Sequence, residues 1–113
     1  LIFFYLFPGS ILGLIVYDDL SSQPQITRDF IVSSNHVYAF IILSTLGFLT
    51  YKNSSNKLQL SIYLITLSIL LEIFHLFIPE RSFELPDLFG NLIGVVIMLI
   101  ITLFLKKYEN LKN

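Results

Sequence analysis

Residues 72–94, EIFHLFIPERSFELPDLFGNLIG, hold most of the functional-looking polar side chains of an otherwise apolar chain. Hydrophobic residues make up 55% of the 113 residues and charged residues only 13%, which is about half the usual share in a soluble protein. Apolar runs of nearly membrane-spanning length flank this stretch on both sides. Ionisable groups at or just inside a bilayer surface are costly, so they indicate a functional site or a tight polar contact.

Four apolar runs predict four transmembrane helices, at about 1–17, 35–51, 58–78 and 88–105. Each is close to the length needed to cross a hydrocarbon core of about 30 Å. The runs do not alternate apolar and polar residues, which argues against strands of a membrane barrel. The last run has almost no polar face, which argues against a small soluble bundle. We therefore expect an all-α fold, a four-helix transmembrane bundle that forms one domain over residues 1–113.

The distribution of basic residues predicts the orientation of this bundle. The loop between the second and third helices has two lysines and the C-terminal tail has three, whereas the other two loops have one arginine each, Arg28 and Arg81. Loops rich in Lys and Arg stay in the cytoplasm. We expect a multi-pass protein of the bacterial cytoplasmic membrane with both termini in the cytoplasm, and with residues 79–87 facing outward.

Composition also excludes several classes of function. The net charge of −1 leaves no broad basic field for nucleic acid. The absence of cysteine excludes disulfides and thiolate metal sites. No phosphate loop, nucleophile elbow or zinc signature is present, so we expect no cofactor. Two histidines and two carboxylates of the site described below have the chemistry for a metal, but no spacing demands one, and we expect none.

The predicted topology brings separated polar residues to one membrane level. His36 begins the second helix from the outer side, and Glu72 and His75 lie in the last outer turns of the third. Asp87 and Asn91 begin the fourth helix on the same side. Glu72 and His75 share a helix face because they are three residues apart. We expect these five side chains to meet in a pocket beneath the loop at 79–87.

Arg81 and Gly94 complete the expected site. The planar guanidinium of Arg81 suits a carboxylate or a phosphate. Glu72 would be neutral if it were buried alone and ionised if Arg81 folded over it, and both states stay open. Gly94 lies on the same helix face as Asp87 and Asn91 and lets a neighbouring helix approach. Asp87 is expected to act as the N-cap of the fourth helix.

The spacing of these residues resembles that of the VanZ-like family of small bacterial membrane proteins. The family signature of Glu, Gln, Pro, Arg, Asp, Asn and Gly is matched by Glu72, Pro79, Arg81, Asp87, Asn91 and Gly94, with His75 at the position of the Gln. A second family motif, an Asp-Lys pair followed by His, Ala and Tyr, is matched only in part. His36 and Ala39 are kept, Val32 and Ser33 replace the charged pair, Phe40 replaces the Tyr, and Tyr38 lies nearby.

The resemblance implies a role at the cell envelope, because the family's namesake is associated with resistance to the glycopeptide teicoplanin. The first hypothesis is a binding role, in which His36, Glu72, His75, Arg81, Asp87 and Asn91 hold a membrane lipid or an envelope amphiphile such as a lipopeptide or glycopeptide. The second is a membrane enzyme that acts on a lipid-linked substrate, with Glu72 as the best catalytic candidate. The third is a purely structural polar contact between helices, with Arg81 paired to Glu72 or Asp87. Self-association is left open, and a proton path across the bilayer is disfavoured by the apolar inner halves of the helices.

Overall fold

The computed structural model describes residues 2–79 and 81–112, so Leu1, at the start of the first predicted helix, lies outside the described residues. The described chain is helical and contains no strand, which confirms the all-α prediction. The elements are α1 (Ile2–Leu6), α2 (Ile11–Tyr17), α3 (Ser34–Thr50), α4 (Lys57–Phe74), the short 3₁₀ turn η1 (His75–Phe77) and α5 (Leu85–Lys112).

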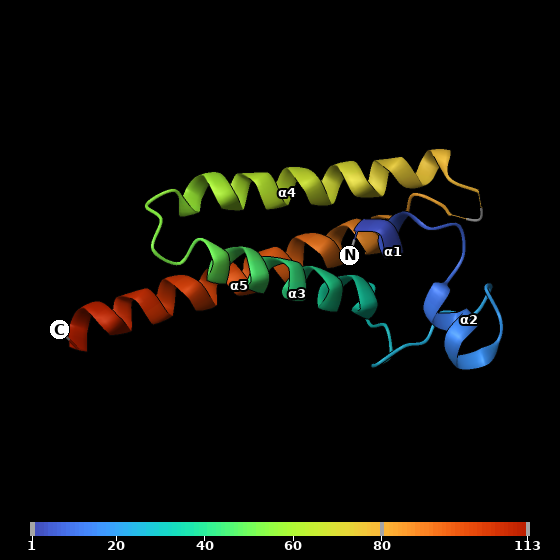
Figure 1. The fold of residues 1–113 in the computed structure, drawn as a ribbon, viewed down its shortest axis with the longest axis horizontal. Helices are drawn as coiled ribbons and strands as arrows, with labels where there is room; N and C mark the ends of the chain where they lie inside the picture. Colours follow the sequence, from blue (N-terminus) through green and yellow to red (C-terminus); the bar gives the residue numbers. More distant parts are fainter. Residues whose placement is uncertain (1, 80, 113) are drawn as a thin grey trace.

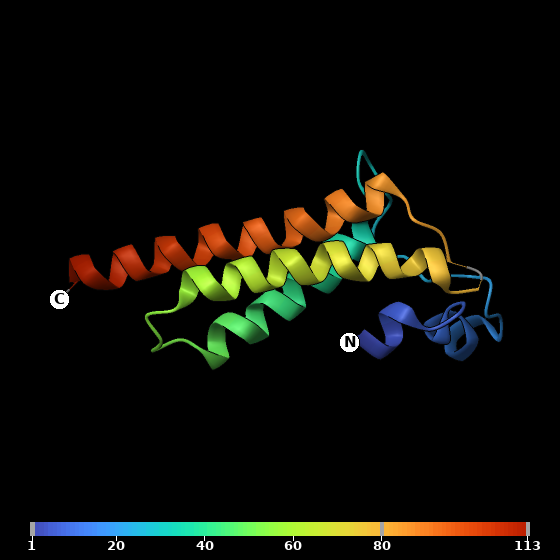
Figure 2. The same cartoon turned by 90° about the horizontal axis from the view of Figure 1, so that it is seen from above.

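Helices α3, α4 and α5 form an elongated bundle, and α1 and α2 lie toward one of its ends (Figure 1). The α3–α4 connection and the C-terminal end of α5 lie at the opposite end from the α4–α5 hairpin (Figures 1 and 2). Successive long helices are therefore antiparallel, as short connections require. Helix α3 packs mainly against α5, and α1 packs against α4.

Among the described residues, two helical segments are long and apolar enough to cross a membrane: Lys57–Phe77, which combines α4 and η1, and Leu85–Lys112. Helix α3 is apolar but has only 17 residues. Only 33% and 22% of the most apolar windows of the two long segments are buried within the protein. Large apolar side chains such as Ile100, Leu103 and Phe104 are exposed, which suits an apolar surrounding better than water.

The prediction of one continuous helix over residues 1–17 is wrong. The run divides into α1 and α2 around Pro8 and Gly9. Proline has no N–H to donate, and Gly9 has a φ of 84°, which is outside the helical region. Ser10 then caps α2, because its hydroxyl oxygen accepts the backbone N–H of Gly13 at 2.8 Å. The prediction relied on the apolar length of the run and overlooked the helix break at Pro8 and Gly9.

The boundaries of the other predicted helices need smaller corrections. The second and third agree with α3 and with α4 plus η1 to within about one residue. The fourth, predicted over 88–105, runs from Leu85 to Lys112. Pro86 is tolerated because the first turn of a helix does not need its N–H. Asp87 therefore lies inside the first turn, and its expected role as the N-cap is wrong.

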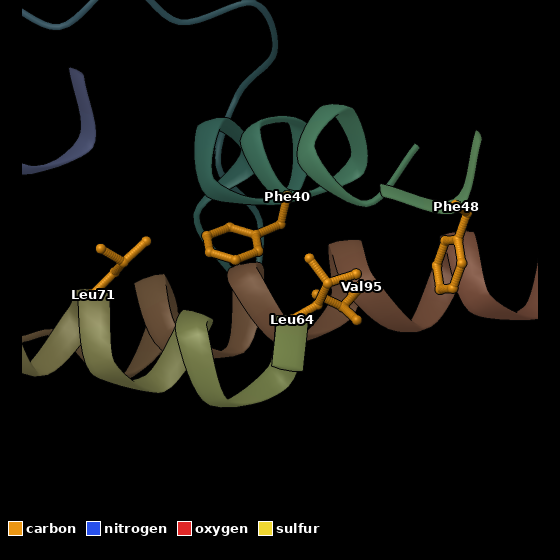
Figure 3. Close-up of a cluster of buried hydrophobic side chains, with 5 residues drawn as sticks. All are labelled: Phe40, Phe48, Leu64, Leu71 and Val95. Atoms are coloured by element: carbon orange, nitrogen blue, oxygen red, sulfur yellow. The ribbon is translucent and has the colours of Figure 1, made fainter. Parts of the chain in front are cut away.

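A narrow apolar core joins the three long helices. Phe40 and Phe48 of α3 face Leu64 and Leu71 of α4 and Val95 of α5 (Figure 3). Close approach of α3 to α5 depends on glycine. A Cβ atom built on Gly94 would lie 2.6 Å from the carbonyl oxygen of Val37 and 2.8 Å from Cβ of Phe40. The predicted packing role of Gly94 is therefore confirmed, and it brings the beginnings of α3 and α5 together.

A side chain from the preceding loop caps the beginning of α3. Oδ1 of Asp29 accepts the backbone N–H of Ser34 at 2.9 Å, while Ser33, at the N-cap position, makes no side-chain cap of its own. The hydrogen bonds from the backbone N–H and the hydroxyl of Ser34 lower the pKa of Asp29 below its ordinary value. An anionic acceptor at this place also suits the helix dipole.

This cap predicts a pH-dependent beginning of α3. Because folding lowers the pKa of Asp29, the stabilisation is complete above the unfolded value of about 3.9 and is lost as the pH falls through the folded value. We expect the backbone amides in the first turn of α3 to lose protection from hydrogen exchange when the pH falls below the folded pKa of Asp29. An Asp29→Asn variant keeps a hydrogen-bond acceptor but cannot titrate, so it should lack this pH-dependent loss of protection. Equal pH dependence in both proteins would contradict the assignment.

Candidate functional site

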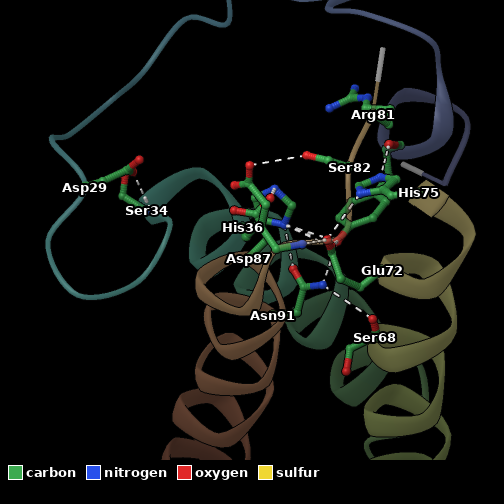
Figure 4. Close-up of polar contacts among 12 residues, drawn as sticks. Asp29, Ser34, His36, Ser68, Glu72, His75, Arg81, Ser82, Asp87 and Asn91 are labelled. Carbon is green, nitrogen blue, oxygen red and sulfur yellow. Dashed lines mark hydrogen bonds and ion pairs between the residues drawn. The ribbon is translucent and has the colours of Figure 1, made fainter. Parts of the chain in front are cut away.

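Polar side chains from five elements meet at the end of the bundle that holds the α4–α5 hairpin (Figure 4). We call them the polar cluster: Tyr5 of α1, His36 of α3, Glu72 of α4, His75 of η1, and Asp87 and Asn91 of α5. The five residues that the sequence assigned to one membrane level are thus in one place, although their binding role stays a prediction. Glu72, His75 and Asn91 are buried, and His36 and Asp87 are partly exposed.

Glu72 lies at the centre of the cluster and is fully buried. Its Oε2 accepts the hydroxyl proton of Tyr5 at 2.6 Å. Its Oε1 accepts the backbone N–H of Glu84 at 3.2 Å and lies 3.4 Å from Nδ1 of His75. Both carboxylate oxygens are therefore hydrogen-bond acceptors, as burial of such a group requires.

The contacts of His75 fix where its protons lie. Nε2 is 3.0 Å from the backbone carbonyl oxygen of Tyr5, which can only accept, so Nε2 carries a proton. The contact between Nδ1 and Glu72 then needs one more proton, held by one of the two groups. Because both oxygens of Glu72 already accept from other donors, the arrangement favours a carboxylate at Glu72 and an imidazolium at His75. His75 occupies the position of the family's Gln. In this arrangement it is the cationic partner of Glu72, a role that the sequence analysis had considered for Arg81.

Asn91 links the cluster across the bundle, and a backbone carbonyl determines its orientation. Nδ2 faces the carbonyl oxygen of Ser68 at 3.4 Å and donates to the hydroxyl of Tyr5 at 2.6 Å. Oδ1 therefore faces Nδ1 of His36, at 3.0 Å. Because an amide oxygen only accepts, Nδ1 of His36 carries a proton. The other ring nitrogen, Nε2, is left to face Asp87.

His36 and Asp87 form the accessible side of the cluster. Nε2 of His36 lies 3.5 Å from Oδ2 of Asp87, which is longer than a good N–H···O hydrogen bond. Their side chains are 15% and 18% exposed. Gly90 allows this approach, because a Cβ atom there would lie 2.7 Å from the carbonyl oxygen of Ser33 and 3.1 Å from Cβ of His36.

Arg81 lies beside the cluster and binds backbone carbonyl groups. Its Nε donates to the carbonyl oxygen of Phe7 at 3.0 Å, and its Nη2 donates to that of Gly9 at 2.8 Å. The ion pairs recorded among the described residues do not include one from Arg81 to Glu72 or Asp87. Arg81 thus ties the hairpin to the turn between α1 and α2, where the chain leaves helical geometry and exposes carbonyl groups.

Tyr5 is the cluster residue that sequence reasoning missed. Its hydroxyl contacts Glu72, Asn91 and His36, and its ring stacks on that of His75 with centroids 4.7 Å apart. The sequence contained one indication of this role, a tyrosine inside an apolar run. A buried tyrosine hydroxyl needs a hydrogen-bond partner. That signal was weak, because tyrosines near the ends of membrane helices are common at the lipid–water interface.

A cavity of about 510 Å³ opens beside the polar cluster. Its apolar wall comes mainly from α1, α2 and α3, and its polar end comes from the loops and the beginning of α5. The apolar wall includes Phe4, Ile11, Leu12, Ala39 and Ile42, and the polar end includes Asp29, His36, Arg81, Glu84 and Asp87. Three carboxylates therefore face the cavity, and the guanidinium that also faces it binds backbone carbonyls.

The geometry defines a class of protein: an apolar bundle of helices with a buried polar cluster at one end. The profile of the VanZ/LLP1 family matches residues 4–106, so the chain belongs to this family. Neither the search of curated proteins nor that of solved structures found a match. Family membership and the two long apolar segments together indicate a membrane-associated protein of the cell envelope.

Proposed function

We propose that this protein is a multi-pass protein of the bacterial cytoplasmic membrane whose cavity binds an envelope amphiphile. The cavity of about 510 Å³ carries the proposal, because its apolar wall adjoins a polar end. An acyl chain would lie along α1, α2 and α3, and the headgroup would face His36 and Asp87. Small-molecule sites commonly combine an apolar wall with a few polar groups in this manner.

The charges at the polar end favour a headgroup that bears an amine or hydroxyl groups. Asp29, Glu84 and Asp87 outnumber Arg81, whose Nε and Nη2 are bound to the α1–α2 turn. Like charges brought together at an interface are unfavourable, so a bare anionic headgroup fits less well than one with an amine. A lipid with an amine, or a lipopeptide or glycopeptide, suits the cavity better.

The lysines support the proposed orientation. Lys52, Lys57 and Lys106 line a groove at the opposite end of the bundle from the polar cluster. Basic residues favour the cytoplasmic side, so the cavity would open outward. In that orientation the ligand belongs to the outer leaflet or to the space beyond it.

The proposal is tested with tag-free protein purified in detergent, in the presence of a chelator. We expect phosphatidylethanolamine, which has an amine, to bind about tenfold more tightly than phosphatidylglycerol, a difference of about 1.4 kcal/mol. Asp87→Asn should reduce this preference, whereas Glu109→Gln, a carboxylate of the opposite groove, should not. Equal binding of both lipids, or an unchanged preference in Asp87→Asn, would overturn the charge assignment.

A second candidate is an enzyme that acts on a lipid-linked substrate, and the accessible pair His36 and Asp87 favours it. Glu72, the best catalytic candidate from sequence, is fully buried and both its oxygens are bound. A general base must reach the proton that it removes, and His36 lines the cavity, with Nδ1 held by Asn91 and Nε2 3.5 Å from Asp87. Absence of turnover of lipid-linked substrates would reject this candidate, and turnover that survives His36→Gln would remove His36 as the base.

A further inference from the structure

We propose that His36, Glu72 and Asp87 form a binding site for a divalent metal cation of the zinc class. One ligand atom from each residue can be chosen so that all three lie within 4.8 Å of one another. The three residues come from three different helices, α3, α4 and α5. This inference goes beyond amphiphile binding and does not depend on it.

The distances are close to those of a metal centre. Zinc binds histidine nitrogen and carboxylate oxygen at about 2.0–2.2 Å, so ligand atoms of one ion lie roughly 3–4 Å apart. His36 Nε2 and Asp87 Oδ2 are 3.5 Å apart, and His36 Nδ1 and Glu72 Oε2 are 4.0 Å apart. Because the 4.0 Å distance is measured from Nδ1, the Glu72 carboxylate would have to turn from Tyr5 toward Nε2 to bring one nitrogen and two oxygens around one ion.

The hydrogen bonds around His36 and Glu72 prepare these two residues as ligands. The amide oxygen of Asn91 holds a proton on Nδ1 of His36, so Nε2, which faces Asp87, is the ring nitrogen that would bind an ion. This is the arrangement by which an outer partner orients a metal-binding histidine. Glu72 is held in the acceptor state by Tyr5 and by the backbone of Glu84.

The balance of charge also calls for a cation. Glu72 and Asp87 bring two carboxylates to one partly buried site, and His75 faces only the first of them. Buried charges in proteins are paired or bind metals. A divalent ion between Asp87, His36 and Glu72 would supply the missing positive charge.

Access and an open coordination position are provided by the cavity. His36 and Asp87 line it, whereas Glu72 lies behind them and is fully buried. An ion held by these three ligands would keep a side toward the cavity, where water or a ligand could complete the coordination. Three protein ligands with an open fourth position are typical of zinc sites that bind or activate another molecule.

The test is titration of tag-free, lipid-free protein in detergent with Zn²⁺ alone, followed by calorimetry and by thermal unfolding. We expect one equivalent to bind and to raise the unfolding temperature. His36→Gln and Asp87→Asn should each weaken the affinity by a factor on the order of 100 or more, given that even outer-shell changes cost about 10–100-fold. Circular dichroism checks that both variants fold.

The matched control is Glu84→Gln, which removes a carboxylate that also lines the cavity but lies outside the three ligands. It should keep stoichiometry and affinity. Absence of a saturable equivalent in the parent protein would overturn the proposal, and so would an equal loss in Glu84→Gln and Asp87→Asn, which would show only diffuse attraction to acidic groups. Because the lipid test uses a chelator and this one uses no lipid, failure of either proposal leaves the other measurable.

Discussion

A His75→Leu variant is expected to lose about 3 kcal/mol or more of unfolding free energy, because removal of one partner of a buried ion pair leaves an uncompensated charge. Leucine is similar in volume, but it cannot contact Oε1 of Glu72, which lies 3.4 Å from Nδ1 of His75, or donate to the carbonyl oxygen of Tyr5. Glu72 is fully buried, so water cannot replace the lost contact. Thermal unfolding in detergent, followed by far-ultraviolet circular dichroism, measures the change.

The control for this prediction is His75→Gln, which introduces the residue usual in the family. Glutamine keeps an N–H donor for the carbonyl oxygen or the carboxylate, so we expect a loss of about 1 kcal/mol, the size of one hydrogen bond. The comparison separates the need for a donor from the need for a charge. If leucine were tolerated as well as glutamine, the Glu72–His75 contact would contribute little to stability, and the cluster would be held together by other contacts.

The parts of the structure that follow from sequence are those fixed by local periodicity. Helices α4 and α5 come from long apolar runs, and the short connection between them makes them antiparallel. The spacing of Glu72 and His75, and of Asp87 and Asn91, places each pair on one helix face. Together with His36 at the beginning of α3, these rules were sufficient to predict that five of the six residues of the polar cluster meet, all except Tyr5.

The parts that did not follow are contacts made by irregular backbone. Arg81 donates to the carbonyl oxygens of Phe7 and Gly9, more than 70 residues away in sequence. Those carbonyls are available only because Gly9 interrupts the first helix, and no periodicity describes such a break. From charge alone, we expected Arg81 to pair with Glu72 or Asp87. In the structure, His75 is the cationic partner of Glu72. The polar contact between helices therefore exists with partners other than those expected.

The second large effect is expected at Gly94. A Gly94→Ala variant should lower the unfolding free energy by about 1–3 kcal/mol, the usual result of overfilling a packed interface, although alanine favours helix by about 1 kcal/mol. Its Cβ would lie 2.6 Å from the carbonyl oxygen of Val37, and backbone cannot move aside as a flexible side chain can. Thermal unfolding in detergent measures the loss.

Gly47→Ala is the matched control, because Gly47 is also a helical glycine at a helix interface. There, a new Cβ would meet only side-chain carbons of Leu60 and Leu64, at 3.6 Å or more. We expect Gly47→Ala to be neutral or slightly stabilising. Gly94→Ala should have one further consequence that the control lacks: by separating α3 from α5 it would move His36 away from Asn91 and Asp87. It should therefore weaken zinc and lipid binding as well as stability, and a variant that lost stability alone would show that the polar cluster does not depend on this helix contact.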